Sequence, residues 1–401
     1  MNTSLAGATQ DELRRHNFGR LVGILHVNGS MSRADLTRLT GLNRSTVGAL
    51  TTDLAQAGLV RESAPVGRGV GRPSIVVAPN SDGVFALAFD LRVERTVAAV
   101  VGLGGVVLTR QEVRHSRRHT APAEVLCEVE RLASELVAAA PDGAVCLGVG
   151  MAIPGVVRHT DGLVRFAPNM GWVDVPIASL LRELLATSLP IFVGNDADLG
   201  AISEHVRGVA RGASNVVFLS GEVGVGGGII LGGRPMMGAG GYGGEVGHMV
   251  VNPSGRSCRC GRRGCWETEI GEDAVLIALG GGRRDDVDAL LAPLTLRASD
   301  DAPELRRVAR WLGLGLANLV NIFNPEVVVF GGLLRKILPL VEAHLREHFD
   351  TALVAPREQV RLALPGLGRD SALLGAAESV FAPLLADPLG NLGRTRVASV
   401  V

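Results

Sequence analysis

The spacing of hydrophobic residues separates a short helical segment at the start of the chain from a longer region of alternating strands and helices. Apolar residues recur every three or four positions over 17–28, 32–40 and 43–57, which predicts three helices, and Gly41 supplies the turn between the last two. Two short helices joined by a glycine turn are typical of a helix-turn-helix, although an ordinary helical hairpin has the same pattern.

Two short strand patterns, 59–60 and 75–77, follow these helices and flank a loop rich in glycine and arginine. Such a loop between paired strands is suited to enter a minor groove, where arginine favours narrow A·T tracts. A flexible basic linker would explain the composition of the loop but not the strands beside it. We therefore predict a winged helix-turn-helix domain over residues 1–80. The residues expected to contact DNA are Arg44, Ser45 and Thr46 at the start of the third helix, and Arg68 and Arg72 in the loop.

Beyond residue 80, strand patterns dominate and helices separate them. The predicted strands cover 84–91, 96–101, 106–113, 145–151, 191–193, 215–219, 229–231 and 327–330, and the two longest helices cover 122–140 and 305–323. Two hairpin-rich α/β lobes with a cleft between them match the actin/hexokinase/ribonuclease-H-like type of fold. We place the first lobe at 81–195 and the second at 196–401. Asn195 and Asp196, where a strand ends and a helix begins, are expected to line the cleft, although either would also serve as an ordinary helix N-cap.

Charge is distributed unevenly along the chain, although the formal net charge is zero. Residues 1–80 hold nine arginines against five acidic residues, so a basic head precedes a mildly acidic body. This distribution favours a protein that contacts nucleic acid locally, through its head, over a protein that coats nucleic acid along its whole surface. No apolar run approaches the ~20 residues of a membrane helix, and the first residues lack the pattern of a signal peptide. We therefore expect a cytoplasmic protein without a membrane partner.

Three of the five cysteines lie within eight residues, shortly after a histidine. Three thiolates and one imidazole in so short a segment are the ligand set of a closed tetrahedral zinc site. A disulfide with one spare thiol is the alternative, but it requires an oxidising compartment. We predict about one structural Zn²⁺ per chain, which would also hold Glu245 and Glu267 rigidly beside a site for a hydroxyl-rich ligand. The predicted metal ligands are His248, Cys258, Cys260 and Cys265.

The segment from Glu245 to Glu267 resembles the signature of the ROK family of sugar kinases and sugar-responsive repressors. Other motifs agree with it: Ile153-Pro-Gly155-Val, Pro168-Asn169-Met-Gly-Trp172, Asn195-Asp196-Ala, Asn324-Pro-Glu-Val-Val-Val-Phe-Gly-Gly332 and Gly368-Arg-Asp-Ser-Ala-Leu-Leu-Gly375. The resemblance runs from about residue 84 to about residue 380, and a basic N-terminal domain is the arrangement of the repressor branch. The cysteine motif is highly specific, whereas the glycine loops alone would not be.

The resemblance implies a sugar site in the cleft and assigns zinc to the four ligands named above. The implied sugar-binding residues are Gly155, Asn169, Asn195, Asp196, Glu245, His248 and Glu267. Vicinal hydroxyl groups both donate and accept hydrogen bonds, so carboxylates and amides bind them in pairs. A zinc-bound histidine presents its other ring nitrogen to a ligand. In the kinases of the family, the aspartate that matches Asp196 is the base that deprotonates the attacking hydroxyl.

Two loops depart from the kinase pattern. Kinases of the family have Asp-x-Gly-Gly-Thr at the first strand turn, where backbone amides approach the phosphates of ATP. Here Arg92, Val93 and Glu94 replace Gly-Gly-Thr, and Glu222 and Val223 replace the Gly-Thr of the second phosphate loop. Each change removes space or a donor, and each loop gains a carboxylate that would repel a triphosphate. We therefore expect no kinase activity and no catalytic residue.

These observations predict a sugar-responsive transcriptional regulator, specifically a repressor. It would bind operator DNA as a homodimer or homotetramer and would take a sugar or sugar phosphate as its effector. An ATP-dependent sugar kinase with a DNA-binding head is the alternative function. A DNA-binding protein regulated by a protein partner is a third class, and the intact polar residues of the cleft argue against it.

Overall fold

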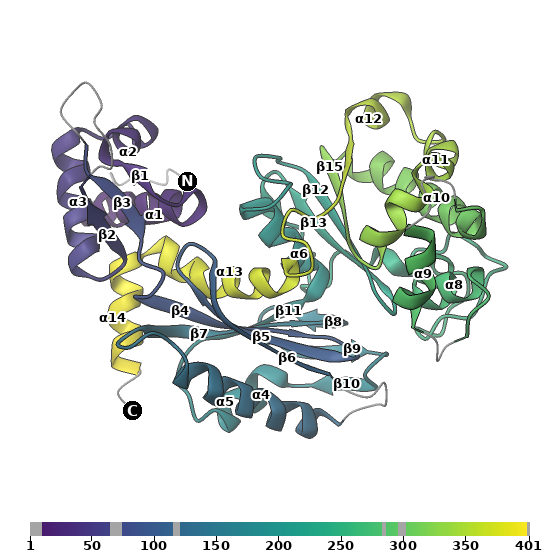
Figure 1. Ribbon diagram of the computed structural model, residues 1–401, viewed down its shortest axis with the longest axis horizontal. Helices are drawn as coiled ribbons and strands as arrows, with labels where there is room; N and C mark the ends of the chain where they lie inside the picture. Colours follow the sequence, from purple (N-terminus) through teal and green to yellow (C-terminus); the bar gives the residue numbers. More distant parts are fainter. Residues whose placement is uncertain (1–9, 65–73, 115–120, 283–285, 296–301, 399–401) are drawn as a thin grey trace, which may run out of the picture.

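The structure is a computed structural model that describes residues 10–64, 74–114, 121–282, 286–295 and 302–398. Figure 1 shows an N-terminal head, a first lobe built on one β-sheet and a second lobe built on another. This arrangement confirms the predicted two-lobed α/β body preceded by a head of helices and short strands.

The head combines three helices with an antiparallel sheet in the order β1-β3-β2. Its elements are α1 (Gln10–Asn28), β1 (Met31–Ser32), α2 (Arg33–Thr40), α3 (Arg44–Gln56), β2 (Val60–Ser63) and β3 (Val76–Pro79). The predicted start of the second helix is confirmed, because the Ser32 hydroxyl accepts a hydrogen bond from the Asp35 amide at 3.0 Å. Asn43 caps α3, since its side-chain oxygen accepts from the Thr46 amide at 2.8 Å.

The first lobe is a mixed five-stranded sheet in the order β11-β7-β4-β5-β6. Its strands are β4 (Val84–Leu91), β5 (Arg95–Gly102), β6 (Val106–Arg114), β7 (Val145–Ile153) and β11 (Ile191–Asn195). Every residue of the central strand β4 is buried, because helices cover both faces of the sheet. Figure 1 shows α4 (Pro122–Ala138) and α5 (Ile177–Leu184) on one face and α13 (Ser371–Ala386) on the other. A small antiparallel sheet of β8 (Val156–Arg158), β9 (Leu163–Ala167) and β10 (Trp172–Val175) adjoins this lobe and has no counterpart among the predicted strands.

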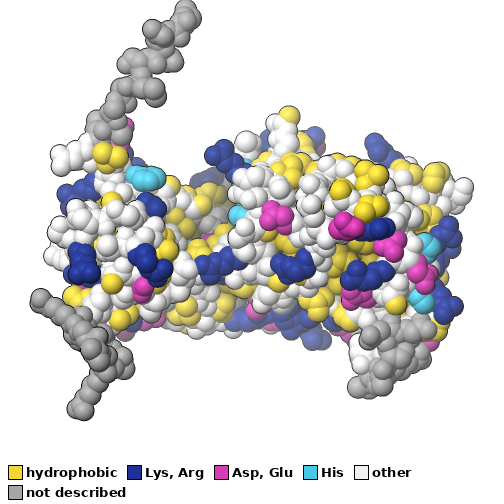
Figure 2. All heavy atoms as spheres, turned by 90° about the horizontal axis from the view of Figure 1, so that it is seen from above, with side chains coloured by type: hydrophobic (Ala, Val, Ile, Leu, Met, Phe, Trp, Pro, Cys, Tyr) yellow, Lys and Arg dark blue, Asp and Glu magenta, His cyan; other side chains and the backbone are white. Residues whose placement is uncertain are grey.

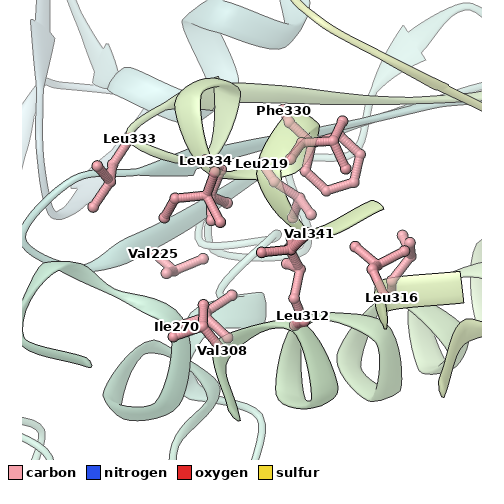
Figure 3. Packing of buried hydrophobic residues seen from close by; sticks show 14 of the residues in the cluster. Leu219, Val225, Ile270, Val308, Leu312, Leu316, Phe330, Leu333, Leu334 and Val341 are labelled. Carbon is pink, nitrogen blue, oxygen red and sulfur yellow. The ribbon is translucent and has the colours of Figure 1, made fainter. Parts of the chain in front are cut away.

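The second lobe is a mixed sheet in the order β14-β13-β12-β15-β16. Its strands are β12 (Val216–Gly221), β13 (Val225–Leu231), β14 (Arg234–Pro235), β15 (Val327–Gly332) and β16 (Arg361–Ala363). The helices of this half are α6 (Asp196–Val206), α7 (Trp266–Ile270), α8 (Glu272–Ala278), α9 (Val287–Thr295), α10 (Arg306–Phe323), α11 (Leu334–Phe349) and α12 (Val354–Gln359). In its core (Figure 3), Leu219 and Phe330 of the sheet pack with Leu312 and Leu316 of α10 and Val341 of α11.

The last two helices leave the second lobe and return to the first. α13 packs against β4, β7 and α6, and α14 (Pro388–Ala398) packs against α13 and α1. The boundary therefore differs from the predicted second lobe of 196–401. The physical reason is that α13 is apolar around most of its circumference, so it must be covered by the sheet on one side and by the head on the other.

The loop after β12 is shorter than the glycine-rich sequence suggests, because most of its glycines belong to a strand. β13 begins at Val225, so the glycines 226–228 are strand residues paired with β12. A Cβ atom at Gly228 would lie 2.1 Å from the backbone oxygen of Ala197 in α6. These glycines therefore allow α6 to pack directly on the strand.

Two properties of the whole molecule complete the description. Basic and acidic side chains are interspersed on the face of the body shown in Figure 2, in keeping with the formal net charge of zero. Within the described ranges, no single helix is long and apolar enough to cross a membrane. The segments Ser371–Ala386 and Pro388–Thr395 reach that length and composition only as a pair bent by 113°.

Candidate functional site

A solvent-open cleft of about 610 Å³ between the lobes is lined by all seven residues that the sequence predicts as sugar ligands. They are Gly155, Asn169, Asn195 and Asp196 on one side, and Glu245, His248 and Glu267 on the other. Phe166 adds an apolar ring to the wall. The described residues that line this cleft include no lysine and no arginine. The folding of the chain thus brings distant polar groups together, and their binding of a sugar stays a prediction.

Asn195 uses its side chain to hold the cleft in shape. Its Oδ1 accepts hydrogen bonds from the amides of Ala197 and Asp198, at 2.8 and 3.2 Å, and so caps α6. Its Nδ2 donates to the backbone oxygen of Gly155 at 2.8 Å. The N-cap interpretation of Asn195 is therefore confirmed. The same side chain also ties the start of α6 to the turn that follows β7.

Gly155 has a backbone conformation and surroundings that exclude a larger residue. Its φ is 147°, and a Cβ atom would lie 2.7 Å from the backbone oxygen of Phe166. A side chain here would displace the small β8–β9 sheet from the cleft.

Asp196 is the first residue of α6, and its carboxylate lies at the centre of the cleft. The Ser220 hydroxyl donates to its Oδ2 at 3.1 Å. Burial, and then the charge of Asp90, raise the pKa of Asp196 to about 7, while the charge of Arg92 acts in the opposite direction. A carboxyl group that titrates near neutrality is ready either to accept a hydrogen bond from a hydroxyl group or to donate one.

Asp198 is a second, half-buried acid near the cleft, and the sequence analysis did not select it. Burial, and then the charges of Glu245 and Asp196, raise the pKa of Asp198 to about 8. Its side chain lines an adjoining, mainly apolar cavity together with His159 and Met237. The sequence carries only a weak signal for this position, because an acid in the first turn of a helix is common.

His248, Cys258, Cys260 and Cys265 come together at the edge of the cleft, and their ligand atoms all lie within 4.8 Å of one another. The Sγ atoms of Cys260 and Cys265 are 3.7 Å apart, and Cys258 Sγ is also 3.7 Å from His248 Nδ1. Two sulfur atoms at about 2.3 Å from a tetrahedral zinc ion lie about 3.8 Å apart. All three cysteines are free thiols, and a sulfur separation of 3.7 Å is far longer than a disulfide bond.

Local backbone geometry explains why this short segment can enclose a metal. Gly261 and Gly264 have φ values of 88° and 74°, in the left-handed region that favours glycine. A Cβ atom at Gly264 would lie 1.7 Å from the backbone oxygen of Asn252, so no larger residue fits. Glu267 follows the last cysteine in α7, and its Oε1 accepts from the Cys258 thiol at 2.8 Å. The cysteine segment therefore positions a carboxylate that faces the cleft.

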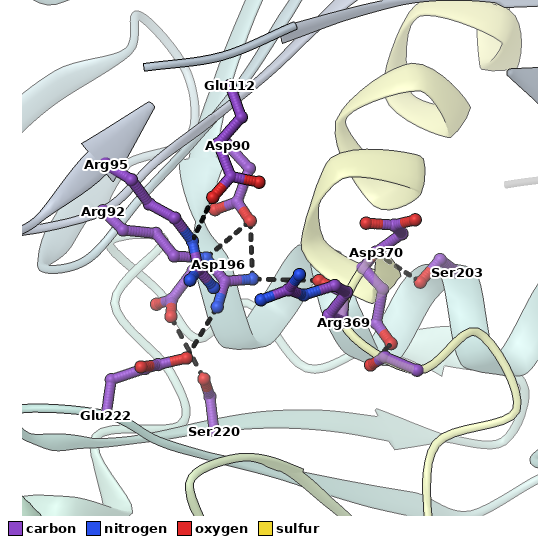
Figure 4. A network of polar contacts seen from close by, with 12 residues as sticks. Asp90, Arg92, Arg95, Glu112, Asp196, Ser203, Ser220, Glu222, Arg369 and Asp370 are labelled. Carbon is purple, nitrogen blue, oxygen red and sulfur yellow. Dashed lines mark hydrogen bonds and ion pairs between the residues drawn. The ribbon is translucent and has the colours of Figure 1, made fainter. Parts of the chain in front are cut away.

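The two loops predicted to depart from the kinase pattern meet each other across the cleft, as Figure 4 shows. Arg92 donates from Nε to Asp90 Oδ2 at 2.7 Å and from Nη1 to Glu222 Oε1 at 2.6 Å. Its Nη2 donates to the backbone oxygen of Arg369 at 3.0 Å. Burial alone would lower the pKa of Arg92. The carboxylates of Asp90 and Glu222 raise it by more, so the pKa of Arg92 lies above its usual value. The sequence identified both substitutions, but not that they form a single network.

In the head, the predicted DNA-contacting residues are only partly described. Arg44 and Ser45 are exposed at the first turn of α3, and Thr46 is half-buried. The Ser45 hydroxyl donates to Asn43 Oδ1 at 2.7 Å. Arg68 and Arg72 lie outside the described residues.

Known proteins match both the body and the complete chain. A profile of the ROK family matches residues 86–382. A xylose repressor of Bacillus spizizenii is 28% identical over 383 residues, which covers 93% of this chain and 97% of the repressor. The structure of a ROK family transcriptional regulator, a homologue of the E. coli MLC protein, superposes with a TM-score of 0.75 at 24% identity and covers 96% of this chain and 98% of that chain. A ROK family glucokinase from Streptomyces griseus, in complex with glucose and AMPPNP, gives a TM-score of 0.62 at 27% identity, covering 74% of this chain and 98% of the kinase. The chain belongs to the ROK family.

Proposed function

We propose that this ROK-family protein is a sugar-responsive transcriptional repressor that binds operator DNA through its head and a sugar in the cleft. The observation that carries the proposal is the presence, in one chain, of a polar interlobe cleft and a head with the elements of a winged helix. The relatives that match nearly the full length of the chain include a xylose repressor, whereas the glucokinase matches only 74% of it.

The chemistry of the cleft favours a neutral polyhydroxylated ligand. Asp196, Glu245 and Glu267 supply carboxylate oxygens, and Asn169 supplies an amide. Such groups bind vicinal hydroxyls in pairs. A phosphate group would meet these acids, while Arg92 and Arg259, which are bonded to the lining residues Glu222 and Asn169, already have partners. D-xylose, the sugar named by the repressor relatives, is therefore the first ligand to test.

The cysteine segment fits a structural zinc ion by its donor set and by its spacing. Three thiolates and one imidazole at these separations complete a tetrahedral site. A bound zinc ion would neutralise part of the thiolate charge and hold the segment in one conformation. His248, with Nδ1 directed to the sulfurs, would then present Nε2 toward the cleft, beside Glu267.

The proposed DNA-binding mode is that of a symmetric oligomer that reads two half-sites. One helix-turn-helix makes only a few base contacts, so two heads are needed for useful specificity. Arg44 at the start of α3 is exposed and is the candidate for direct contact with a base. We expect Arg44→Ala to weaken operator binding by about 1–3 kcal/mol and to relax sequence preference at one position of each half-site.

An operator titration with and without sugar tests the proposed function. The operator is selected from a random DNA pool by the purified protein, and binding is measured by fluorescence anisotropy in the presence of D-xylose or other neutral sugars. We expect the effective sugar to weaken operator binding about 5- to 150-fold. Asp196→Ala and Glu245→Ala should bind the operator normally and ignore the sugar. Glu342→Ala, an exposed acid on α11, is the matched control and should respond like the wild type.

Two results would contradict the proposal. One is the absence of any selected DNA sequence. The other is a sugar response that survives unchanged in both cleft variants, which would place the effector elsewhere.

A further inference from the structure

Helix α6 extends from the sugar cleft to the DNA-binding head. Its first residues, preceded by Asn195, line the cleft, and its C-cap is Arg207. Eleven helical residues span about 16 Å at 1.5 Å per residue. The same helix packs on β12 and β13 of the second lobe and on α13, which covers the sheet of the first lobe. One continuous helix therefore connects the cleft to Arg207, so a movement at the cleft can reach the other end of α6.

At the far end of α6, Arg207 joins three parts of the molecule in a buried polar cluster. Its Nε donates to Glu378 Oε1 of α13 at 2.7 Å, and its Nη1 donates to the backbone oxygen of Gly104 at 2.8 Å. Its Nη2 lies 2.6 Å from Nε2 of His26, which belongs to helix α1 of the head. The side chains of Arg207, Glu378 and His26 are 10%, 5% and 0% exposed. We name these three residues and Gly104 the Arg207 node.

The hydrogen bonds of the node fix the tautomer of His26. The Gly104 amide donates to His26 Nδ1 at 2.9 Å, so this nitrogen is an acceptor. Nε2 therefore carries the proton and donates to Glu378 Oε2 at 3.0 Å, so the neighbouring Arg207 Nη2, which can also only donate, contacts the ring without a hydrogen bond to it. Burial raises the pKa of Glu378, but the hydrogen bond from His26 and the charges around it lower the pKa below its usual value. The head is thus held by directional bonds to groups that also bind α6.

Close backbone packing makes this connection stiff. A Cβ atom at Gly375 of α13 would lie 1.9 Å from the backbone oxygen of Leu199 in α6. A Cβ atom at Gly19 of α1 would lie 2.5 Å from the backbone oxygen of Leu385 in α13. Glu204 of α6 adds a buried bond, because its Oε1 accepts from the Ser371 hydroxyl at 2.8 Å. Helices in such contact cannot slide past one another without breaking these bonds.

We propose that α6 and the Arg207 node transmit the state of the sugar cleft to the DNA-binding head. This inference rests on the proposed function, and it assigns the regulatory route of the same site. A ligand that moves the second lobe moves α6 with it, because α6 packs on β13. Because Glu204 and Ser371 hold α6 to α13, Arg207 and Glu378 then move together relative to His26, and the orientation of α1 changes. Coupling of this kind needs an element with two arrangements. In this proposal the element is the Arg207 node, whose hydrogen bonds from His26 to Glu378 and from Arg207 to Gly104 are intact in one arrangement and broken in the other.

A hydrogen-exchange experiment on the full chain tests the route without a sugar or an operator. Asn195→Ala removes the cap of α6 and its tie to Gly155, so it perturbs α6 from the cleft end. We expect amide exchange in α1 to accelerate about 5-fold or more in this variant. In the Arg207→Met background, the same Asn195→Ala change should have little further effect on α1, because the route is already broken.

Two additional variants keep the test decisive. Asn169→Ala perturbs the same cleft from the β9–β10 turn, outside α6, and should leave exchange in α1 unchanged. Arg207→Lys keeps the charge beside Glu378 but cannot make the forked contacts to both Glu378 and Gly104, so it should uncouple the head even if Arg207→Met fails to fold. The route is refuted if α1 exchange does not respond to Asn195→Ala, or responds equally with and without Arg207.

The operator titration separates this inference from the proposed function. If the wild type responds to sugar, Arg207→Lys should bind the sugar with wild-type affinity and bind the operator, but should lose most of the sugar response. If the wild type does not respond, the proposed function fails, and the exchange experiment still decides whether α6 connects the cleft to the head.

Discussion

The two halves of the interlobe cleft both contain charged groups but use them differently. In the half lined by Asn169, Glu245 and Glu267, these polar side chains line the open cleft, although Glu267 also accepts from the Cys258 thiol and Asn169 from Arg259. In the other half, Arg92 is bound by Asp90 and Glu222, so charges from both lobes are matched within the protein. The first half is therefore suited to receive a neutral ligand. In the second half the Arg92 charge is already bound within the protein, although Arg92 and Glu222 also line an open pocket of about 880 Å³.

This difference shows that ligand binding in such a fold depends on which polar groups are not already paired within the protein. A buried charge is stable only when it is paired, so the Arg92 network is a structural element of this chain. The same positions hold glycine and threonine in the kinase pattern, where bare amides meet phosphate. An internal ion pair at these positions is compatible with the two-lobed architecture, and we expect it to oppose the binding of phosphate.

The largest expected effect concerns the metal beside the ligand-facing half. Cys265→Ser should abolish stoichiometric zinc retention, since structural zinc sites contribute on the order of 10 kcal/mol of binding free energy. Elemental analysis of freshly purified protein measures the zinc content directly. Cys127→Ser is the matched control, because Cys127 is an exposed cysteine outside the cluster. Wild-type protein without zinc would refute the assignment of the site.

In the self-paired half, Arg92→Met should destabilise the fold by about 3–5 kcal/mol, because it leaves the Asp90 carboxylate buried and unpaired. Urea denaturation measures this change. Arg165→Met, which removes an exposed ion pair with Asp174, should cost less than about 1 kcal/mol. Equal losses in the two variants would show that the Arg92 network is not a structural element.

An effect of comparable size, but dependent on pH, concerns Asp196 between the two halves. The pKa of Asp196 is raised to about 7, so its charged form is disfavoured in the folded state. Its contribution to stability is therefore fully present below pH 4, is lost as the pH rises from about 4 to about 7, and stays constant above. Asp196→Asn should become progressively more stable than wild type across this interval, as measured by urea denaturation at several pH values. A constant difference between the two proteins would argue against the raised pKa.

The smallest expected effect is none at all. A coupled assay with ATP and common hexoses or pentoses should detect no phosphoryl transfer, because Arg92 and Glu222 occupy the phosphate loops. Sustained turnover that disappears in Asp196→Asn would instead establish the sugar kinase as the function of this chain.

Local sequence signals predicted much of this architecture. Ser32 and Gly41 bound the second helix as expected, and the four predicted metal ligands converge. These features depend on residues close together in sequence, or on a motif whose spacing is fixed by chemistry. The pairing of Arg92 with Glu222 and the return of α13 to the first lobe were not predictable in this way, because each depends on contacts between distant segments. Asp198 was missed because its environment, rather than its position in a pattern, makes it unusual.

The contact of α1 with α13 and α14 has a practical consequence for protein engineering. The two ends of the chain form one folded unit, so the DNA-binding head is not a module that ends at residue 80. A chimaera that receives this head alone would leave Gly19 without the helix against which it fits. Transplanting the specificity of this protein therefore requires residues 371–398 together with the first eighty.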